Sequence, residues 1–268
     1  MAARRDGFPY RFTDAIVREP AVSVVNALRG GDGPPPDVGS FRAQHAAYVA
    51  ALERAGLVVR TLPALEDFPD SVFIEDAALC LPEGAIVLRP GAPSRAGEAP
   101  AVGPILREIF PEVRALGPNG SVDGGDILVT EAGVFAGLSS RTDGAGFAAL
   151  AEVLESWGHM AETVPLPTGV LHLKSDCSLL DDETILASHR LADADCFKPF
   201  RVLRTADGED AAANAVRIND TVLLADGYPR TAERLVNAGF TIECVPTSQA
   251  AILDGGLSCL SLRYHRGP

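Results

Sequence analysis

The sequence predicts an α/β fold in which about five ββαβ units are arranged around a common axis. The first observation is a recurring spacing: a Leu, a Gly four residues later, then an aliphatic residue and a Pro ten and eleven residues after the Leu. It occurs at 52–63, 154–165 and 235–246, with a degraded copy at 106–118. The second observation is that apolar residues at helical spacing precede the Gly. Units that cannot bury their apolar faces alone stack against one another.

The elements of each unit follow from local chemistry. We expect a helix to end at Gly56, Gly158 and Gly239, because Gly adopts the left-handed conformation that stops a helix. β-rich runs follow at 57–62 and 240–245, and a Pro closes each one because it cannot donate to a strand ladder. After a loop, a second apolar strand is expected in each unit, at 72–81, 126–129, 171–180 and 257–262.

The widest gap between copies lies between Gly158 and Leu235, and it has room for one more unit. Its strands are expected at 200–204 and 216–224. We therefore predict a single domain over residues 1–268. The alternative is an ordinary open α/β sheet in which helix–Gly–strand signals recur without symmetry, and the shared spacing argues against it.

The composition limits the classes of function. Acidic residues outnumber basic residues 36 to 23, which gives a net charge of −13 and disfavours binding to nucleic acid or to an anionic membrane surface. No apolar run approaches membrane-spanning length, and no apolar segment of a secretion signal follows Arg4 and Arg5. Five cysteines form an odd and sparse set, so we expect reduced thiols and a cytoplasmic protein.

Polar residues follow the Pro of several units, and a pseudo-symmetric fold brings such equivalent positions together at its axis. They are Glu75-Asp76, Asp123-Gly-Gly-Asp126, His172 and, after a Gly-Gly turn, Cys259. A thiol, an imidazole and carboxylates at one place suit nucleophilic catalysis on a cationic substrate. Each member has a structural alternative: His172 fits a satisfied structural histidine equally well.

The context of Cys259 sets it apart from the other cysteines. Its Gly-Gly turn places it at the start of a strand, whereas Cys80, Cys177 and Cys244 lie in apolar runs where a cysteine is usually a small buried hydrophobe. Glu75 and Asp76 are expected on an apolar strand, where adjacent residues face opposite sides, so one of the two carboxylates points inward and needs a partner. The chain contains no CxxC or HExxH motif and no full glycine fingerprint, so neither a metal nor a dinucleotide cofactor is expected.

Together these motifs resemble the dimethylarginine dimethylaminohydrolase family. The resemblance rests on Phe68 to Asp76, Arg89 to Arg95, Asp123 to Asp126, Gly137 to Thr142, Leu171 to Ser175 and Asp254 to Cys259, in order along nearly the whole chain. It implies a five-bladed α/β-propeller and the hydrolysis of Nω-methylated arginines to citrulline and a methylamine without a cofactor. The implied partner is a small cationic amino acid, and the oligomeric state stays open.

The resemblance also implies roles for individual residues. Cys259 is the nucleophile and His172 the proton donor and base. Asp123 is a carboxylate that orients the histidine or contacts the guanidinium, at a position where many bacterial relatives have Glu. The resemblance implies that Glu75 and Asp76 bind the guanidinium and that Asp70 contacts the α-amino group. It implies that Arg95 and Arg141 clamp the carboxylate. Leu28 is the implied contact from a lid loop, and Leu253 and Asp254 are implied to contact the substrate mainly through their backbone.

Two other functions compete with this interpretation. An arginine deiminase would use the same thiol chemistry on unmethylated arginine, but that family typically has an aspartate two residues after its histidine, where this chain has Lys174. A non-catalytic protein that binds cationic amino acids needs no thiol, so the presence of Cys259 together with His172 and Asp123 argues against it.

Overall fold

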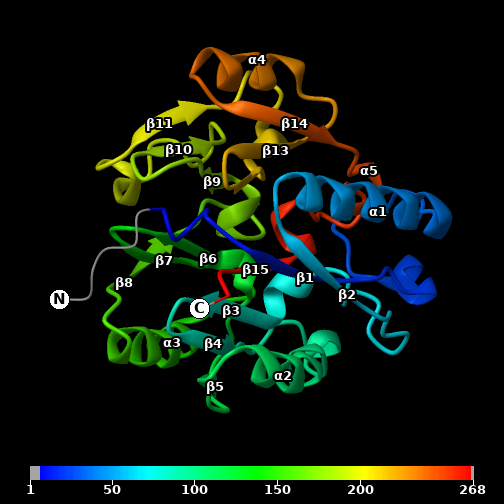
Figure 1. Cartoon of the computed structure of the whole chain (residues 1–268), viewed down its shortest axis with the longest axis vertical. Helices are drawn as coiled ribbons and strands as arrows, with labels where there is room; N and C mark the ends of the chain where they lie inside the picture. Colours follow the sequence, from blue (N-terminus) through cyan, green and yellow to red (C-terminus); the bar gives the residue numbers. More distant parts are fainter. Residues whose placement is uncertain (1–6, 267–268) are drawn as a thin grey trace.

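The computed structural model describes residues 7–266, so Arg4 and Arg5 lie outside the described residues. Five three-stranded sheets surround a central axis (Figure 1). Their strands are β1 (Asp14–Arg18), β2 (Val58–Leu62) and β15 (Leu262–Tyr264); β3 (Ala78–Leu81), β4 (Gly84–Val87) and β5 (Val113–Ala115); β6 (Ile127–Thr130), β7 (Gly133–Leu138) and β8 (Ala161–Pro165); β9 (Cys177–Leu179), β10 (Thr184–Ala187) and β11 (Arg201–Arg204); β12 (Val216–Ile218), β13 (Thr221–Ala225) and β14 (Thr241–Val245). The predicted pseudo-fivefold α/β fold is confirmed.

Every sheet has the same topology. Its middle strand pairs antiparallel with one neighbour and parallel with the other, and the parallel partner is reached by a crossover connection. The crossover helices are α1 (Val38–Arg54), α2 (Glu98–Ile109), α3 (Gly144–Ser156) and α4 (Pro229–Asn237). The unit of β9 to β11 differs from the prediction, because its crossover contains only the short 3₁₀ turn η6 (Asp195–Phe197).

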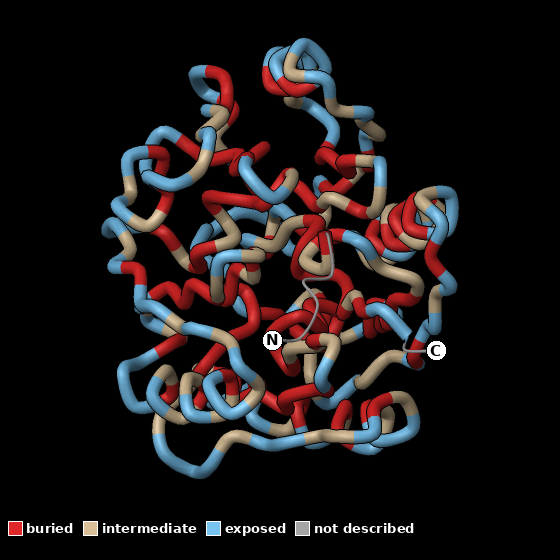
Figure 2. The backbone as a smooth tube through the Cα atoms, turned by 60° about the vertical axis from the view of Figure 1, so that its left-hand side comes forward, coloured by how far each residue is buried: buried red, intermediate tan, exposed pale blue. Residues whose placement is uncertain are grey.

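The first sheet joins the two ends of the chain. β15 pairs antiparallel with β1, with Asp14 opposite Tyr264, while β2 pairs parallel with β1 on the other side. Because residues from both ends share one sheet, the ring of units is closed by hydrogen bonds. Buried residues gather inside this ring and exposed ones on the outer helices and loops (Figure 2).

The glycines predicted to end helices have the backbone conformation that this role requires. Gly56, Gly158 and Gly239 follow α1, α3 and α4 with φ of 99°, 85° and 94°. Each helix buries one face against a sheet; in α1 this face includes Phe41, Tyr48 and Leu52. No helix within residues 7–266 combines the length and apolar character needed to cross a membrane.

The inner end of each unit is a 3₁₀ turn rather than the start of a strand. These turns are η2 (Ile74–Ala77), η4 (Gly124–Asp126), η5 (Leu173–Ser175), η7 (Asp210–Ala213) and η8 (Ser258–Leu260). The strand predicted over 72–81 therefore begins only at Ala78, and the prediction that Glu75 and Asp76 lie on it is wrong. η2 lies beside η4 and η8, and η4 beside η5, so the turns surround the axis.

Three cysteines were predicted to be buried in strands, and they have different environments. Cys177 is buried, Cys80 is partly buried, and Cys244 on β14 is exposed. The prediction is wrong for Cys244 because β14 is an edge strand of its sheet, and its first four residues are exposed or only partly buried.

Candidate active site

Cys259 lies in the turn η8, where the chain enters the last strand. It is buried, with 7% of its surface exposed. Asn214 fixes the turn, because its Oδ1 accepts a hydrogen bond from the Ser258 backbone N–H at 3.0 Å. Burial raises the pKa of the Cys259 thiol to about 11, and the carboxylates of Glu75 and Asp76 act in the same direction. The thiol is therefore protonated at neutral pH until a nearby positive charge lowers its pKa.

His172 precedes the turn η5, and its ring is buried among carboxylates. Its Nε2 lies 3.0 Å from Asp123 Oδ2, and Asp126 Oδ1 holds the turn by accepting from the Leu173 backbone N–H at 3.0 Å. Burial alone would lower the pKa of His172, but Asp76 and Asp123 contribute most to raising it to about 9. The ring is an imidazolium at neutral pH, with Nε2–H donating to Asp123 and Nδ1–H left for chemistry.

Two turns meet at the Asp123-Gly-Gly-Asp126 motif, and glycine makes their contact possible. A Cβ atom on Gly125 would lie 2.8 Å from His172 Nδ1. The Gly125 backbone N–H also donates to Asp76 Oδ1 at 2.8 Å. A side chain at position 125 would therefore separate the histidine from the carboxylate that helps to keep it charged.

Asp76 shares this cavity with a buried arginine. The Arg95 guanidinium donates to Asp76 Oδ2 at 2.5 Å, to the Phe73 carbonyl at 2.9 Å and to the Glu98 carboxylate. Burial would raise the pKa of Asp76, but Arg95 and His172 lower it to about 2. All three guanidinium nitrogens of Arg95 already have protein partners, so the structure does not present it as a free clamp.

Arg141 has a different environment. Its side chain lines the same cavity and forms no hydrogen bond or ion pair within residues 7–266. Only its backbone N–H is held, by Ser139 Oγ at 2.9 Å. A half-buried guanidinium without a partner suits a carboxylate, which it can grip with two parallel hydrogen bonds.

A loop covers the cavity and is tied down by two carboxylates. Asp70 Oδ1 accepts from the Leu28 backbone N–H at 3.1 Å, and Asp254 Oδ2 accepts from Gly30 N–H at 2.7 Å. Leu28 is 40% exposed, whereas Leu253 is buried in the cavity wall. The two carboxylates that the resemblance assigned to substrate contacts thus also hold the loop above the cavity.

One cavity of about 240 Å³ brings most of the predicted site residues together. Its lining includes Leu28, Asp70, Asp76, Arg95, Arg141, His172, Leu253, Asp254 and Cys259. Asp123 lies behind the histidine and is fully buried. Glu75 does not line this cavity: it lines another one, together with Lys174 and Arg263.

The pair Glu75 and Asp76 therefore divides between the two cavities. Both are buried, which the prediction of one inward carboxylate did not anticipate. The 3₁₀ turn explains the outcome, because both residues lie in the inner ring and successive side chains leave the turn in different directions.

Three side chains could hold a metal ion by distance alone. Asp76, Asp123 and His172 each offer one atom, and these atoms lie within 4.8 Å of one another. Arg95 already occupies Asp76 Oδ2, and His172 Nε2 is bonded to Asp123. The protein's own cations thus compensate these carboxylates.

Sequence reasoning assigned no role to three residues that support the site. Asp126 belonged to the quoted motif, and Glu98 lies three residues after Arg95, a spacing typical of an ion pair. Asn214 directly follows η7, so an alignment of the repeats would have placed it in the ring.

Comparisons with known proteins agree with this geometry. The family model described as arginine deiminase matches residues 59–226. A dimethylarginine dimethylaminohydrolase of Pseudomonas aeruginosa is 35% identical over 94% of this chain and 100% of its own length. One of Streptomyces coelicolor is 32% identical over 93% of this chain and 96% of its own length.

Solved structures show the same relationship. A cysteine-to-serine mutant of the Pseudomonas aeruginosa enzyme, complexed with citrulline, superposes with a TM-score of 0.92 at 35% identity over 95% of this chain and all of that chain. A cyanobacterial arginine dihydrolase domain bound to its product reaches a TM-score of 0.83 at 19% identity over 96% of this chain and 97% of its own, and shares the fold.

Proposed function

Because the chain belongs to the dimethylarginine dimethylaminohydrolase family, we propose that it hydrolyses Nω-methylated arginines to citrulline and dimethylamine or methylamine. The observation that carries this proposal is one cavity lined both by the reacting groups Cys259, His172 and Asp76 and by the guanidinium of Arg141, which has no partner within residues 7–266. An amino acid with a cationic side chain and a carboxylate complements both kinds of lining group.

The first half of the reaction forms a covalent intermediate. The substrate guanidinium enters beside Asp76 and Cys259, and its positive charge lowers the pKa of the thiol, which loses its proton to solvent. The thiolate attacks the guanidinium carbon and forms a carbon–sulfur bond. The imidazolium of His172 then gives its Nδ1 proton to the methylated nitrogen, and the carbon–nitrogen bond breaks with release of the neutral amine. An S-alkylthiouronium remains on Cys259.

The second half consumes one water. Neutral His172 accepts a proton from water as its oxygen attacks the thiouronium carbon, which restores the imidazolium. The tetrahedral adduct collapses, the carbon–sulfur bond breaks, and the leaving sulfur takes up the hydroxyl proton of the adduct, which releases citrulline and restores the thiol. Asp123 keeps the ring oriented through both halves because its Oδ2 remains bonded to Nε2.

The substrate contacts are proposed residue by residue. Arg141 binds the α-carboxylate, and Asp70, which also holds the loop at Leu28, faces the α-amino group. Arg95 contributes by neutralising Asp76 rather than by a free clamp, and Asp254 and Leu253 complete the wall. Glu75 affects the guanidinium only from behind the cavity.

Lys174 favours methylated over unmethylated arginine. Its ammonium group is bonded to Glu75 at 2.6 Å and lines the opposite cavity, so this position offers the substrate no hydrogen-bond acceptor. Because Lys174 lines the other cavity, the N–H groups of arginine receive no acceptor from position 174 and stay unpaired on that side, whereas methyl groups need no partner. Each lost partner costs roughly 1–3 kcal/mol.

The wider context is also a proposal. We infer a cytoplasmic enzyme with a single catalytic domain and no nucleic-acid or membrane partner. The five cysteines are free, the net charge is −13, and β1 and β15 join both ends of the chain in one sheet.

A kinetic comparison tests the proposal. Purified protein is incubated with asymmetric dimethylarginine, monomethylarginine and arginine, and citrulline is measured by a colorimetric assay. We expect kcat/KM for both methylated substrates to exceed that for arginine by at least tenfold. Arginine as the best substrate would establish a deiminase instead, and citrulline from none of the three would leave a binding protein.

A further inference from the structure

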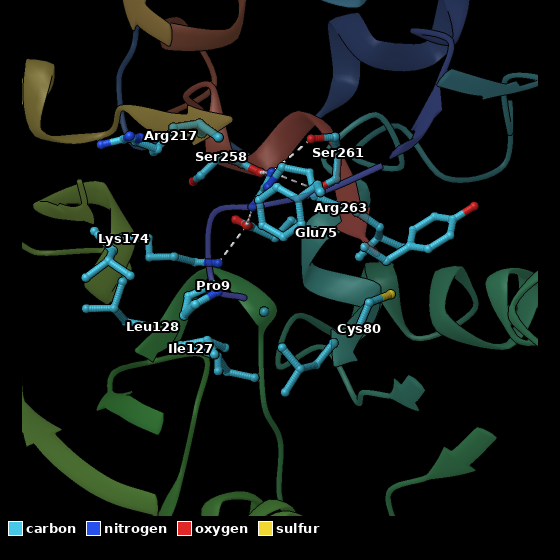
Figure 3. Close-up of a pocket in the computed structure, with 18 of the residues that line it drawn as sticks. Pro9, Glu75, Cys80, Ile127, Leu128, Lys174, Arg217, Ser258, Ser261 and Arg263 are labelled. Carbon is cyan, nitrogen blue, oxygen red and sulfur yellow. Dashed lines mark hydrogen bonds and ion pairs between the residues drawn. The ribbon is translucent and has the colours of Figure 1, made fainter. Parts of the chain in front are cut away.

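The inner ring separates two cavities along the axis, and residues close in sequence face opposite cavities. Asp76, His172 and Cys259 line the active-site cavity, whereas Glu75, Lys174 and Ser258 line the second cavity. We call this second space, about 130 Å³ in volume, the rear cavity (Figure 3). The segments at the turns η2, η5 and η8 thus contribute residues to both cavities and lie between them.

A cluster of three charges lies in the wall of the rear cavity. Glu75 Oε1 accepts hydrogen bonds from Lys174 Nζ at 2.6 Å and from Arg263 Nη2 at 2.7 Å, as Figure 3 shows. Both ion pairs are largely buried, with side-chain exposures of 15% or less. Glu75 Oε2 has no hydrogen-bond partner within the described residues. Two cations therefore share one carboxylate, and the cluster carries a net charge of +1.

This cluster is attached to the nucleophile. Arg263 Nη1 donates to the Ser258 carbonyl at 2.9 Å, and Ser258 directly precedes Cys259 in η8. The same Nη1 donates to Ser261 on the other side of Cys259. The turn that carries the thiol is thus held by the guanidinium that also holds Glu75.

The choice of residue at 174 is informative. The chain contains 23 basic residues, and only Lys174 and Lys198 are lysines. Lys198 is on the surface, with 76% of its side chain exposed, and pairs with Asp195. Lys174 is instead a compact charge at the end of a long stem that reaches Glu75 from another unit.

We propose that Lys174 and Arg263 are positioning residues for Cys259: through Glu75 they cancel the negative charge behind the thiol, and Arg263 anchors its turn. This inference rests on the proposed role of Cys259 as the nucleophile. It assigns Glu75 a place behind the sulfur, in contrast to the guanidinium contact that the resemblance implied.

The electrostatics of the thiol fit this arrangement. Burial and the charges of Glu75 and Asp76 raise the pKa of Cys259. Arg95 and His172 compensate Asp76 in front, and Lys174 and Arg263 compensate Glu75 behind. The charged or titratable groups that line the active-site cavity are Arg29, Asp70, Asp76, Arg95, Arg141, His172 and Asp254. Those that line the rear cavity are Glu75, Cys80, Lys174, Cys177, Arg217, Arg263, Tyr264 and His265, and Tyr48 also acts on Arg263.

The test follows alkylation of Cys259 by iodoacetamide over a range of pH, with the modified peptide quantified by mass spectrometry. It uses no substrate, so it stays valid whether or not methylarginines are hydrolysed. Lys174→Met lowers the net charge of the cluster from +1 to 0. We expect the alkylation midpoint to rise by about one pH unit, which is about tenfold slower modification at a pH below the midpoint.

A double variant separates charge from structure. Glu75→Gln/Lys174→Met returns the cluster to a net charge of +1, so its midpoint should return to that of the wild type. Lys174→Arg should stay close to the wild type. Lys198→Met is the matched control, since it removes the other lysine without touching the site. If the single variant does not fold, the double variant carries the test.

Two outcomes would overturn the proposal. One is a Lys174→Met midpoint that coincides with the wild type. The other is a double variant whose midpoint lies well above the wild type, because a purely structural loss would not be rescued by removing the carboxylate. Normal alkylation without any hydrolysis of methylarginine would refute only the proposed function.

Discussion

Asp123→Asn should lower the pKa of His172 and leave the shape of the active site nearly unchanged. Asp123 uses both oxygens: Oδ1 accepts from the Gly91 backbone N–H at 2.7 Å, and Oδ2 lies 3.0 Å from His172 Nε2. Asparagine has the same shape, and the Gly91 N–H requires its carbonyl oxygen. Its amide nitrogen must then face Nε2, where it can donate only to a neutral ring.

The magnitude follows from the charges around the ring. The rise in the pKa of His172 from 6.5 to about 9 corresponds to roughly 3 kcal/mol in favour of the imidazolium. Asp123 contributes both a hydrogen bond and a charge, and Asp76 and Asp126 supply the rest. Burial opposes these carboxylates, so together they raise the pKa by more than the net change, and removing the share of Asp123 lowers the pKa of His172 by roughly one to two pH units.

This change has a defined pH signature in stability. A group whose pKa is raised by folding stabilises the native state fully below its unfolded value, here 6.5, and loses that contribution as pH rises through about 9. Asp123→Asn should therefore lower the free energy of unfolding more at pH 6 than at pH 10, by roughly 1–3 kcal/mol.

The assay is an NMR titration of the His172 ring protons, combined with kcat measured from pH 6 to 10. We expect both the titration midpoint and the basic limb of kcat to move down by one to two pH units. Activity at pH 8.5 should fall by roughly threefold to thirtyfold, because a neutral ring cannot protonate the leaving amine. Asp220→Asn, in an exposed turn, is the control. An unchanged His172 midpoint would refute the reasoning.

Three further substitutions probe the other parts of the site. Cys259→Ser should abolish citrulline formation and leave the melting temperature nearly unchanged, since serine supplies no anion at neutral pH; residual turnover by this variant would remove Cys259 from the mechanism. Arg141→Ala should raise KM for dimethylarginine with little change in kcat, and equal KM values for a decarboxylated analogue in both proteins would complete the evidence for a carboxylate clamp. Arg95→Met should destabilise the fold by roughly 3–5 kcal/mol, because Asp76 and Glu98 then remain buried without their cation; a denaturation midpoint equal to that of the wild type would contradict the buried pairing.

The sequence predicted the helix ends and strands of the units better than the 3₁₀ turns that surround the axis. The helix-ending glycines at 56, 158 and 239 and the strands at 58–62 and 241–245 were foreseen, since local backbone preferences determine them. Three of the 3₁₀ turns, η2, η5 and η8, were assigned to strands. Apolar runs such as Val72 to Leu81 carry no periodic signal that separates a turn leading into a strand from the strand itself.

For the active site, the sequence predicted which motifs come together but not where every single side chain points. Motif order correctly brought Cys259, His172 and Asp76 to one cavity, because equivalent positions of the units converge. It did not separate Glu75 from Asp76, since that depends on the direction in which side chains leave a 3₁₀ turn. Nor did the sequence show that every guanidinium nitrogen of Arg95 has a hydrogen-bond partner, because these partners include Glu98 and the Phe73 carbonyl as well as Asp76.

These details bear on how Cys259, whose thiol has a pKa of about 11, would act as the proposed nucleophile. Asp76 is already paired with Arg95, so an incoming guanidinium finds much of the nearby negative charge compensated. The negative charge that can still form beside the substrate guanidinium is the thiolate of Cys259. Binding of the cation and loss of the thiol proton therefore favour each other, since each lowers the free-energy cost of the other. Without a cation the thiol stays protonated, and a protonated thiol resists oxidation and alkylation. Because Arg95 neutralises Asp76, the thiolate of Cys259 forms mainly when a cationic substrate is bound.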